Sequence, residues 1–351
     1  MRKSSNYQRG LTIVELMVGL ALGLFLLAGV LQIYLSSNQT YRSTDALSRM
    51  QENARFAIDF LQADIREAGY KGACGRGQPL KSHLNTSSPD YDETLFDIGD
   101  GIFGWEASNG GYPLSDYRAG TDTILVKHGA TWSGLSASGN TPVNASTINL
   151  TAESGIEQGT IMLISDTNGC ELFQKSNATN ASTLTKAGGG TPGNAQPGED
   201  FSNHYRGDIE ISILQSTIYY IGQSLGGLPS LHRVTYNNGT ASSYPNETAL
   251  VEGISDIQIC YGLDNNNDAS VDTYLKASAV GDWEDVIAAR VTVVAVSPQT
   301  NVATEAVSVQ LHDCDGTVLT RSSTDYAELA QGRIAQAFTS TIALRNRLLY
   351  E

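Results

Sequence analysis

The sequence predicts an α+β protein in which one long N-terminal helix packs on a strand-rich globular head. Three observations predict this fold class. An apolar run opens the 351-residue chain, and a stripe of apolar residues at helical spacing continues from it to residue 68. From residue 122 onwards, short runs rich in β-branched and aromatic residues alternate with loops. The helix therefore comes first, and the strands make the head.

The apolar run covers residues 11–35, where Glu15 is the only charged side chain. At ~1.5 Å per residue this helix would cover roughly 37 Å, more than the about 30 Å of a bilayer core. Arg2, Lys3 and Arg9 precede it without any acidic residue, which places the N-terminus in the cytoplasm. A cleaved secretory signal fits poorly, because no small-residue cleavage site follows the run. We predict a membrane span with an exported head.

Glu15 is the unusual feature of this span, because a charge at full membrane depth costs about 2–3 kcal/mol. Gly10, followed by Leu-Thr-Ile-Val-Glu and the apolar run, resembles the class III leader of type IV prepilins. The resemblance implies that a prepilin peptidase cuts between Gly10 and Leu11 and that the new amine of Leu11 is methylated. It also implies that Glu15 pairs with the N-terminal amine of a neighbouring subunit. Leu11 departs from the phenylalanine more often found there.

A second apolar pattern extends the helix beyond the membrane. Its members recur at steps of three and four residues: Leu47, Met50, Ala54, Ile58, Leu61, Ile65 and Ala68. Two pairs of opposite charges four residues apart stabilise the solvent-exposed side of this helix: Asp45 with Arg49, and Arg55 with Asp59. No proline occurs between residues 11 and 74. We predict one helix from about Leu11 to Ala68, ended by Gly69 and Gly72, whose stripe packs against the head.

Two further stretches narrow the resemblance. Residues 52–75, ENARFAIDFLQADIREAGYKGACG, resemble the stem-to-head junction of PilW-type minor pilins, and residues 338–348 resemble the end of the same family. The implied parts are then a leader (1–10), a transmembrane and assembly helix (11–35), an amphipathic stem (36–68) and a β-rich, pilin-like head (69–351).

The resemblance also implies a role: a minor pilin in the priming or tip complex of a type IV pilus. The implied partners are other minor pilins, the major pilin, the prepilin peptidase, the inner-membrane assembly machinery and the membrane. The chain would start in the inner membrane with a periplasmic head and end in the fibre at the cell surface. Cell adhesion, twitching motility and DNA uptake are uses of such fibres between which the sequence does not choose.

The head is expected to consist mainly of strands. The clearest runs are residues 122–128, 159–165, 209–221, 231–236 and 286–296. The longest polar stretch between them, residues 176–200, has too little apolar content to form a core of its own. We expect it to be a mobile surface loop rather than a partner-binding one.

Four cysteines lie on the exported side, where two disulfides are the simplest reading. Three pairings are possible. We favour Cys260 with Cys314, since the segments that carry them could be sheet neighbours. Cys74 with Cys170 would then clamp the end of the helix to the head.

One polar segment has the spacing of a calcium loop. Oxygen-bearing side chains alternate over residues 262–274: Asp264, Asn266, Asp268, Ser270 and Asp272. Ala269 occupies the position at which a calcium loop has glycine for its tight turn. Leu275 occupies the position of the bidentate glutamate ligand, a role that Glu284 or Asp285 could take instead. We favour a solvated turn over a calcium site, and no other cofactor is expected.

Composition limits the remaining functions. The formal net charge is −15, and it becomes −18 once Arg2, Lys3 and Arg9 leave with the leader. A chain this acidic is poorly suited to nucleic acid. The zinc motif H-E-x-x-H and the phosphate-binding G-x-x-x-x-G-K-[ST] are absent, so we expect no enzyme. A type II secretion minor pseudopilin and a membrane-anchored envelope enzyme or binding protein are the alternatives.

Overall fold

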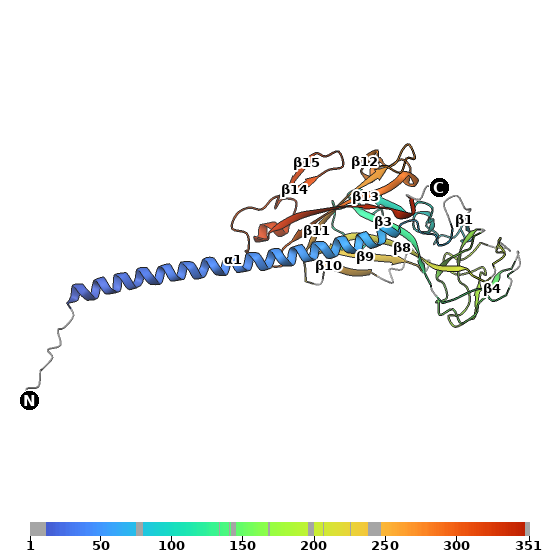
Figure 1. The fold of residues 1–351 in the computed structure, drawn as a ribbon, viewed down its shortest axis with the longest axis horizontal. Helices are drawn as coiled ribbons and strands as arrows, with labels where there is room; N and C mark the ends of the chain where they lie inside the picture. The colour runs from blue at the N-terminus through green and yellow to red at the C-terminus, as the bar shows by residue number, and fades with distance from the viewer. Residues whose placement is uncertain are drawn as a thin grey trace, which may run out of the picture.

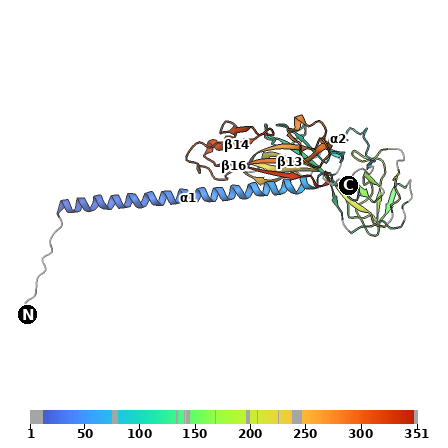
Figure 2. The same cartoon turned by 45° about the horizontal axis from the view of Figure 1, so that its top comes forward.

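The protein is a long helix with a strand-rich head gathered around its second half (Figure 1). The computed structural model describes residues 12–74, 80–132, 134–139, 141, 145–167, 169–195, 200–205, 207–224, 226–237 and 247–347. Helix α1 spans Ile13–Glu67, or 55 residues, about 82 Å at the usual rise. The N-terminal half of α1 runs free of the head in two views (Figures 1 and 2). The predicted α+β fold is confirmed.

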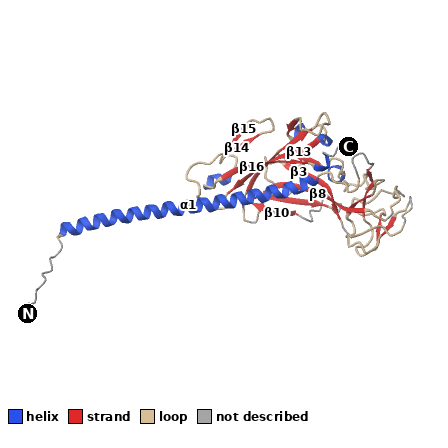
Figure 3. Cartoon of the chain, in the orientation of Figure 1, coloured by secondary structure: helices blue, strands red, loops and turns tan. Residues whose placement is uncertain are grey.

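Strands are the main regular structure of the head, and loops connect them (Figure 3). The first part of the head contains β1 (Leu80–Ser82), α2 (Glu93–Phe96), β2 (Ile102–Trp105), β3 (Thr123–Thr131), β4 (Thr147–Asn149), β5 (Ile161–Ser165), β6 (Cys170–Gln174) and β7 (Thr183–Thr185). The second part contains β8 (Glu210–Gln223), β9 (Pro229–Tyr236), β10 (Glu247–Glu252), β11 (Ile254–Leu263), β12 (Thr273–Leu275), β13 (Val286–Val296), β14 (Val309–His312), β15 (Val318–Arg321) and β16 (Ala335–Ala343). All five strand runs predicted from the sequence are confirmed by β3, β5, β8, β9 and β13.

Two main sheets organise these strands. The larger has the order β1-β6-β5-β8-β3-β2, with β9 added to the second half of β8 and β10 added to β9. The smaller has the order β12-β11-β13-β16. The hairpin β14–β15 and the pair β4–β7 are separate two-stranded sheets. Strand β8 is central, because β3 pairs along one edge while β5 and β9 share the other.

The largest core lies where α1 meets both main sheets. It joins residues of the stem to the inner faces of the smaller sheet and of β3, β8 and β9. A second core covers the opposite face of the larger sheet with residues from the 84–114 segment, among them Leu95, Phe96 and Leu114. Because the centre of the larger sheet is covered on both faces, β3 and β5 are buried at nearly every position rather than at alternate ones.

The buried stripe of the stem differs slightly from the predicted one. Its members are Ala46, Met50, Ala54, Ala57, Leu61, Ile65 and Ala68. Leu47 is 38% exposed, so the prediction was wrong there, whereas Ile58 is partly buried and packs against the core as predicted. Four members of the buried stripe are alanines, whose small side chains let the helix backbone approach the sheets closely. Both predicted ion pairs form on the outer side.

Helix α1 ends as the glycines predict. Ala68 caps the helix, and Gly69 takes φ +74°. A Cβ on Gly101 would lie 2.7 Å from the Gly69 nitrogen, so both positions need glycine where the chain turns into the head. The Gly69 amide then donates to the Lys127 carbonyl of β3. The helix end is thereby joined to the larger sheet.

The lobe at the end of the head farthest from the N-terminal half of α1 contradicts the expectation of a mobile loop at residues 176–200. Much of the 176–200 segment has a defined conformation rather than that of a mobile loop: β7 pairs with β4, and Leu184 is fully buried in a core with Phe173 and Phe201. Asn194 accepts from the Gln174 amide and donates to its carbonyl. Side-chain amides thus add to the order that the buried Leu184 and the β4–β7 pairing provide. Residues 196–199 lie outside the described parts.

Candidate functional site

The exposed half of α1 is the first candidate site. Its apolar side chains from Ile13 to Leu35 are all exposed; Phe25, for example, is 81% exposed. The mean hydropathy of its most apolar 18-residue window is 2.4, with no residue of that window buried. Among the described residues this is the one helix long and apolar enough to cross a membrane. A helix so free of protein contacts needs lipid or other helices around it.

Glu15 lies in the first turn of that helix. Thr12 is the N-cap: its Oγ1 accepts from the Glu15 amide at 3.3 Å, and its hydroxyl lies 3.4 Å from a Glu15 carboxylate oxygen. The Thr-x-x-Glu spacing is that of a capping box, of which the bond from the Glu15 amide to Thr12 is formed, while the carboxylate contacts the Thr12 hydroxyl. A carboxylate at a helix N-terminus is also favoured by the helix dipole. The spacing was present in the sequence but was missed there. Gly10 and Leu11 lie outside the described residues.

The stem is tied to the head by polar contacts along its length. Gln39 donates to the Val302 carbonyl at 2.9 Å, and Asn53 donates to the Glu252 carbonyl at 3.0 Å. Near the end of the helix, Asp64 accepts a bond from Tyr219. Because these hydrogen bonds occur at intervals from residue 39 to residue 64, the second half of α1 and the head form one unit.

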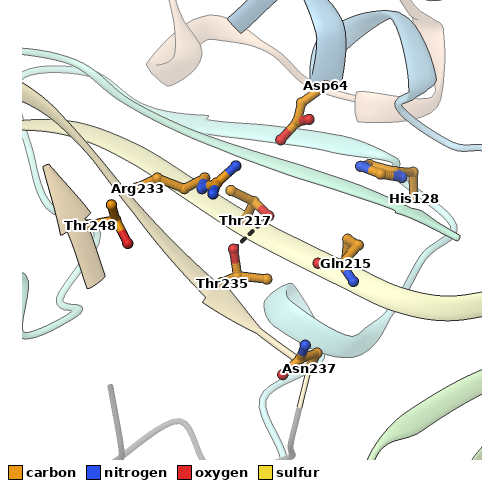
Figure 4. A pocket seen from close by; sticks show the side chains of 8 residues that line it. All are labelled: Asp64, His128, Gln215, Thr217, Arg233, Thr235, Asn237 and Thr248. Carbon is orange, nitrogen blue, oxygen red and sulfur yellow. Dashed lines mark hydrogen bonds between the residues drawn. The ribbon is translucent and has the colours of Figure 1, made fainter. Parts of the chain in front are cut away.

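A polar hollow of about 340 Å³ opens beside the end of the stem (Figure 4). Its lining comes from α1, β3, β8, β9, the residue after β9, and β10: Asp64, His128, Gln215, Thr217, Arg233, Thr235, Asn237 and Thr248. The Thr217 and Thr235 hydroxyls bond each other at 3.2 Å across β8 and β9. The sheet face is therefore apolar under the helix and polar where the helix ends. Among the described residues that line the hollow, the imidazole of His128 is the one aromatic ring.

A second hollow, of about 430 Å³, lies further down the same flank of the helix. It is lined by Asn53, Phe56, Phe60, Leu250, Val251 and Glu252. Phe56 is 48% and Phe60 is 40% exposed. These two rings escaped the sequence analysis, because the stripe of buried residues is one residue away from each of them.

Both disulfides form in the pairing that the sequence favours, Cys74 with Cys170 and Cys260 with Cys314. The first joins the chain just past α1 to the start of β6, as expected. The reason given for the second was wrong. Cys314 lies in the turn of the β14–β15 hairpin, which is not part of the sheet containing β11. This bond therefore joins two separate sheets.

The 264–272 segment folds as a tight polar turn between β11 and β12. The buried Asp264 carboxylate accepts from the amides of Asp268 and Ala269, and Ala269 takes φ +64° in place of the glycine of a calcium loop. Leu275 belongs to β12 and pairs with Tyr261. Among the described residues no three His, Cys, Asp or Glu side chains are placed to hold a metal ion. The preference for a solvated turn over calcium binding by Asp264, Asn266, Asp268, Ser270 and Asp272 stays a prediction.

A buried polar cluster occupies the distal lobe. His83 lies between two charged side chains, 2.5 Å from a Glu171 oxygen through Nε2 and 3.0 Å from Lys186 Nζ through Nδ1. The other oxygen of Glu171 accepts from the amides of Ser202 and Asn203 and from the Tyr205 hydroxyl. His83 and Glu171 are almost fully buried, so no substrate reaches them. The cluster holds β1 and β6 to the loops around them.

The G-x-S-x-G spacing of a hydrolase nucleophile occurs at residues 222–226 and was missed from the sequence. That motif needs a turn from a strand into a helix. Ser224 instead follows β8 in the hairpin turn to β9, where its amide donates to the Leu228 carbonyl. Its hydroxyl has no hydrogen-bond partner in the described structure, and hence no base to activate it there.

Comparison with known proteins adds two matches. Residues 218–346 match the model of the type IV pilus-assembly protein W family, from within β8 to the end of the head. Residues 5–31 match the prokaryotic N-terminal methylation motif. No curated protein and no solved structure matches the chain. The stem junction at residues 52–75 lies outside both matched ranges.

Together with the exposed apolar helix, the two matches support a class for this chain, that of type IV pilus-related pilins. Within that class, the resemblance to PilW-type minor pilins is confirmed by the match over residues 218–346. The methylation motif and the apolar helix indicate membrane anchoring and association with a pilus, and both matches indicate a structural protein rather than an enzyme.

Proposed function

We propose that this chain is a minor pilin that enters the priming or tip complex of a type IV pilus after cleavage between Gly10 and Leu11. The observation that carries the proposal is the unbroken helix α1. It runs from a matched methylation motif, through a span with no buried residue, into a head that it helps to hold together. One rigid element thus joins the membrane to the head.

A low-copy role follows from size and charge. The head of about 280 residues is large for a subunit repeated along a whole fibre, and its charge would repel neighbouring copies of itself. A single copy among unlike partners avoids this repulsion. Other minor pilins and the major pilin are its proposed neighbours, and the prepilin peptidase and the inner-membrane machinery process and assemble it. The N-terminus would be cytoplasmic and the head periplasmic before assembly.

Glu15 would act in assembly. In a span surrounded by lipid, its carboxylate is stabilised by a positive charge on another chain. We propose that this charge is the N-terminal amine of a neighbouring subunit. The contacts between Thr12 and Glu15 support this proposal, because they hold the carboxylate at the very start of the helix.

The experiment is the N-terminal mass of the membrane-extracted protein from cells with and without the prepilin peptidase. We expect a chain that starts at Leu11 and carries one added methyl group, and only when the peptidase is present. An intact Met1 start in both strains would overturn the proposal and make the chain a simple anchored envelope protein.

A further inference from the structure

An apolar groove lies between one flank of α1 and strand β10. We define the α1–β10 groove by the residues that line it: Asn53, Phe56, Phe60, Leu250, Val251 and Glu252. Two half-exposed phenylalanines, four residues apart on one helix face, are an unusual surface for an exported head. The groove therefore needs an explanation beyond packing within this chain.

The groove continues into the polar hollow. Asp64 follows Phe60 by four residues on the same side of the helix, and Thr248 precedes Leu250 by two on β10. The helix side of the combined surface runs from Asn53 to Asp64, roughly 16 Å at the usual rise. Its lower part is apolar and its upper part polar, and the whole surface runs along the axis of α1.

The shape of the groove favours a helix over a strand as its occupant. Within the described structure β10 pairs with β9 alone, so one of its edges is free. The register of that pairing shifts between Ala249 and Val251, at a bulge that includes Leu250. A bulge of this kind blocks the addition of a further strand. An apolar furrow beside a helix instead accepts the apolar stripe of a second helix.

The membrane span determines how such a helix arrives. Because α1 is continuous, a subunit whose helix lies beside the span is carried parallel to α1 and up to the groove. Phe56 lies 21 residues beyond Leu35, about 32 Å above the apolar span. A helix that starts in the membrane beside α1 reaches that height if its stem is as long as this one. A second pilin-type subunit has such a stem.

Charge distinguishes an unlike partner from a second copy. The exposed Glu252 lines the apolar part of the groove, and Asp64 lies at its upper end. The exposed Glu52 precedes Phe56 by four residues, on the same side of the helix. Two copies that met through this groove would bring the same carboxylates together, with two strongly acidic heads beside them. A helix with an apolar stripe and basic flanks complements the groove instead.

We infer that the α1–β10 groove is the docking surface for the stem helix of a different pilin-type subunit, one with apolar residues flanked by lysine or arginine. This inference rests on the proposed function and adds to it the surface by which the chain contacts its neighbour. Phe56 and Phe60 are the anchors, and Glu52 and Glu252 set the charge of the partner.

The test is site-specific photo-cross-linking of the full-length chain in cells. A photoreactive p-benzoylphenylalanine replaces Phe60, and the matched control places it at Gln51. Gln51 is exposed and lies nine residues away, on the opposite side of the helix. We expect an adduct from position 60 whose peptides map to the stem helix of another protein with a prepilin-type leader. We expect no such adduct from position 51.

A second variant tests the anchor itself. Phe60→Asp should abolish co-purification of the cross-linked partner, while Gln51→Asp should retain it, and the thermal midpoint of both should match that of the parent. An adduct with this same chain, equal adducts from both positions, or a partner retained by a folded Phe60→Asp chain overturns the inference. If the leader is cut and the protein is found in fibres without an adduct, the groove alone fails. If the leader is not cut and the protein is absent from fibres, both the proposed function and the docking surface are wrong.

Discussion

Asp64 on α1 accepts a hydrogen bond from the Tyr219 hydroxyl in β8 at 2.5 Å, across 155 residues of sequence. Burial, together with the neighbouring Asp64 carboxylate, raises the pKa of Tyr219 above its usual value. The hydroxyl therefore stays a donor at every physiological pH. This pair lies where the apolar seam between helix and sheet ends and the polar hollow begins.

Tyr219→Phe should destabilise the head by about 1–3 kcal/mol, because it removes a bond to a charged acceptor and leaves Asp64 with one donor fewer. Denaturant unfolding of the purified chain measures the change. Tyr41→Phe is the control, since Tyr41 is 73% exposed, and should leave stability unchanged. Equal effects of the two substitutions would show that the bond contributes nothing.

Asp122 should make the head less stable as pH rises. Burial raises its pKa to about 7, above about 3.9 in an unfolded chain. Between these values the folded state binds more protons, so stability is greatest at the acid end and falls as pH rises through 7, by on the order of a few kcal/mol. Unfolding measured from pH 5 to 8 checks this. Asp122→Asn should reduce the slope, and Asp315→Asn, at an exposed site, should not.

Gly104→Ala should destabilise the junction of the two sheets. A Cβ at this position would lie 2.7 Å from Cζ of the buried Tyr261 and closer still to its hydroxyl oxygen, an overlap that costs about 1–3 kcal/mol. Gly281→Ala is the control, because a Cβ there meets no atom within 4 Å. Adding Tyr261→Phe should recover part of the loss, since that hydroxyl has no hydrogen-bond partner in the described structure. The thermal midpoint of unfolding measures both effects. A double variant no more stable than Gly104→Ala alone would contradict the predicted overlap with the Tyr261 hydroxyl.

Glu15→Ala should leave the protein inserted in the membrane but poorly incorporated into fibres. Glu15→Gln separates two explanations, because glutamine at this position still serves a capping box but carries no charge. We expect Glu15→Gln to be as defective as Glu15→Ala. Immunoblotting of sheared fibres and of membranes measures both quantities. Normal incorporation of Glu15→Gln would assign the residue to the helix cap with Thr12 instead of a charge pair.

Calcium should have no measurable effect on stability. The 264–272 turn satisfies its carboxylates with its own amides, and Leu275 occupies the position where a closing carboxylate is needed. Thermal unfolding of the full chain with millimolar calcium and with chelator checks this. A rise in midpoint with calcium that Asp268→Asn abolishes would establish the site.

The regular elements were predictable, and the physical reason is periodicity. The helix from Ile13 to Glu67 carries an uninterrupted apolar pattern with glycines at its end, and strands such as β8 and β13 are long and rich in β-branched residues. These signals are local. The cysteine pairing could also be favoured from the sequence, although the arrangement that brings Cys314 to Cys260 could not.

What escaped prediction depends on contacts between distant residues. The α1–β10 groove exists because β10 lies beside Phe56 and Phe60, which precede it by about 190 residues in the chain. Tyrosine–carboxylate pairs recur across the head in the same way, as between Tyr326 and Asp256 at 2.6 Å. Residues 176–195 were misjudged because part of their order comes from side-chain amides, which leave no periodic signal.

The position of the Cys74–Cys170 bond determines how the molecule carries a mechanical load. It lies past the end of α1 that is farthest from the span, so tension applied at the membrane is transmitted along the whole helix before it reaches the covalent link to β6. The bonds made by Gln39, Asn53 and Asp64 lie along that path and are loaded together in shear. A head held in this way resists being peeled from its stem one contact at a time.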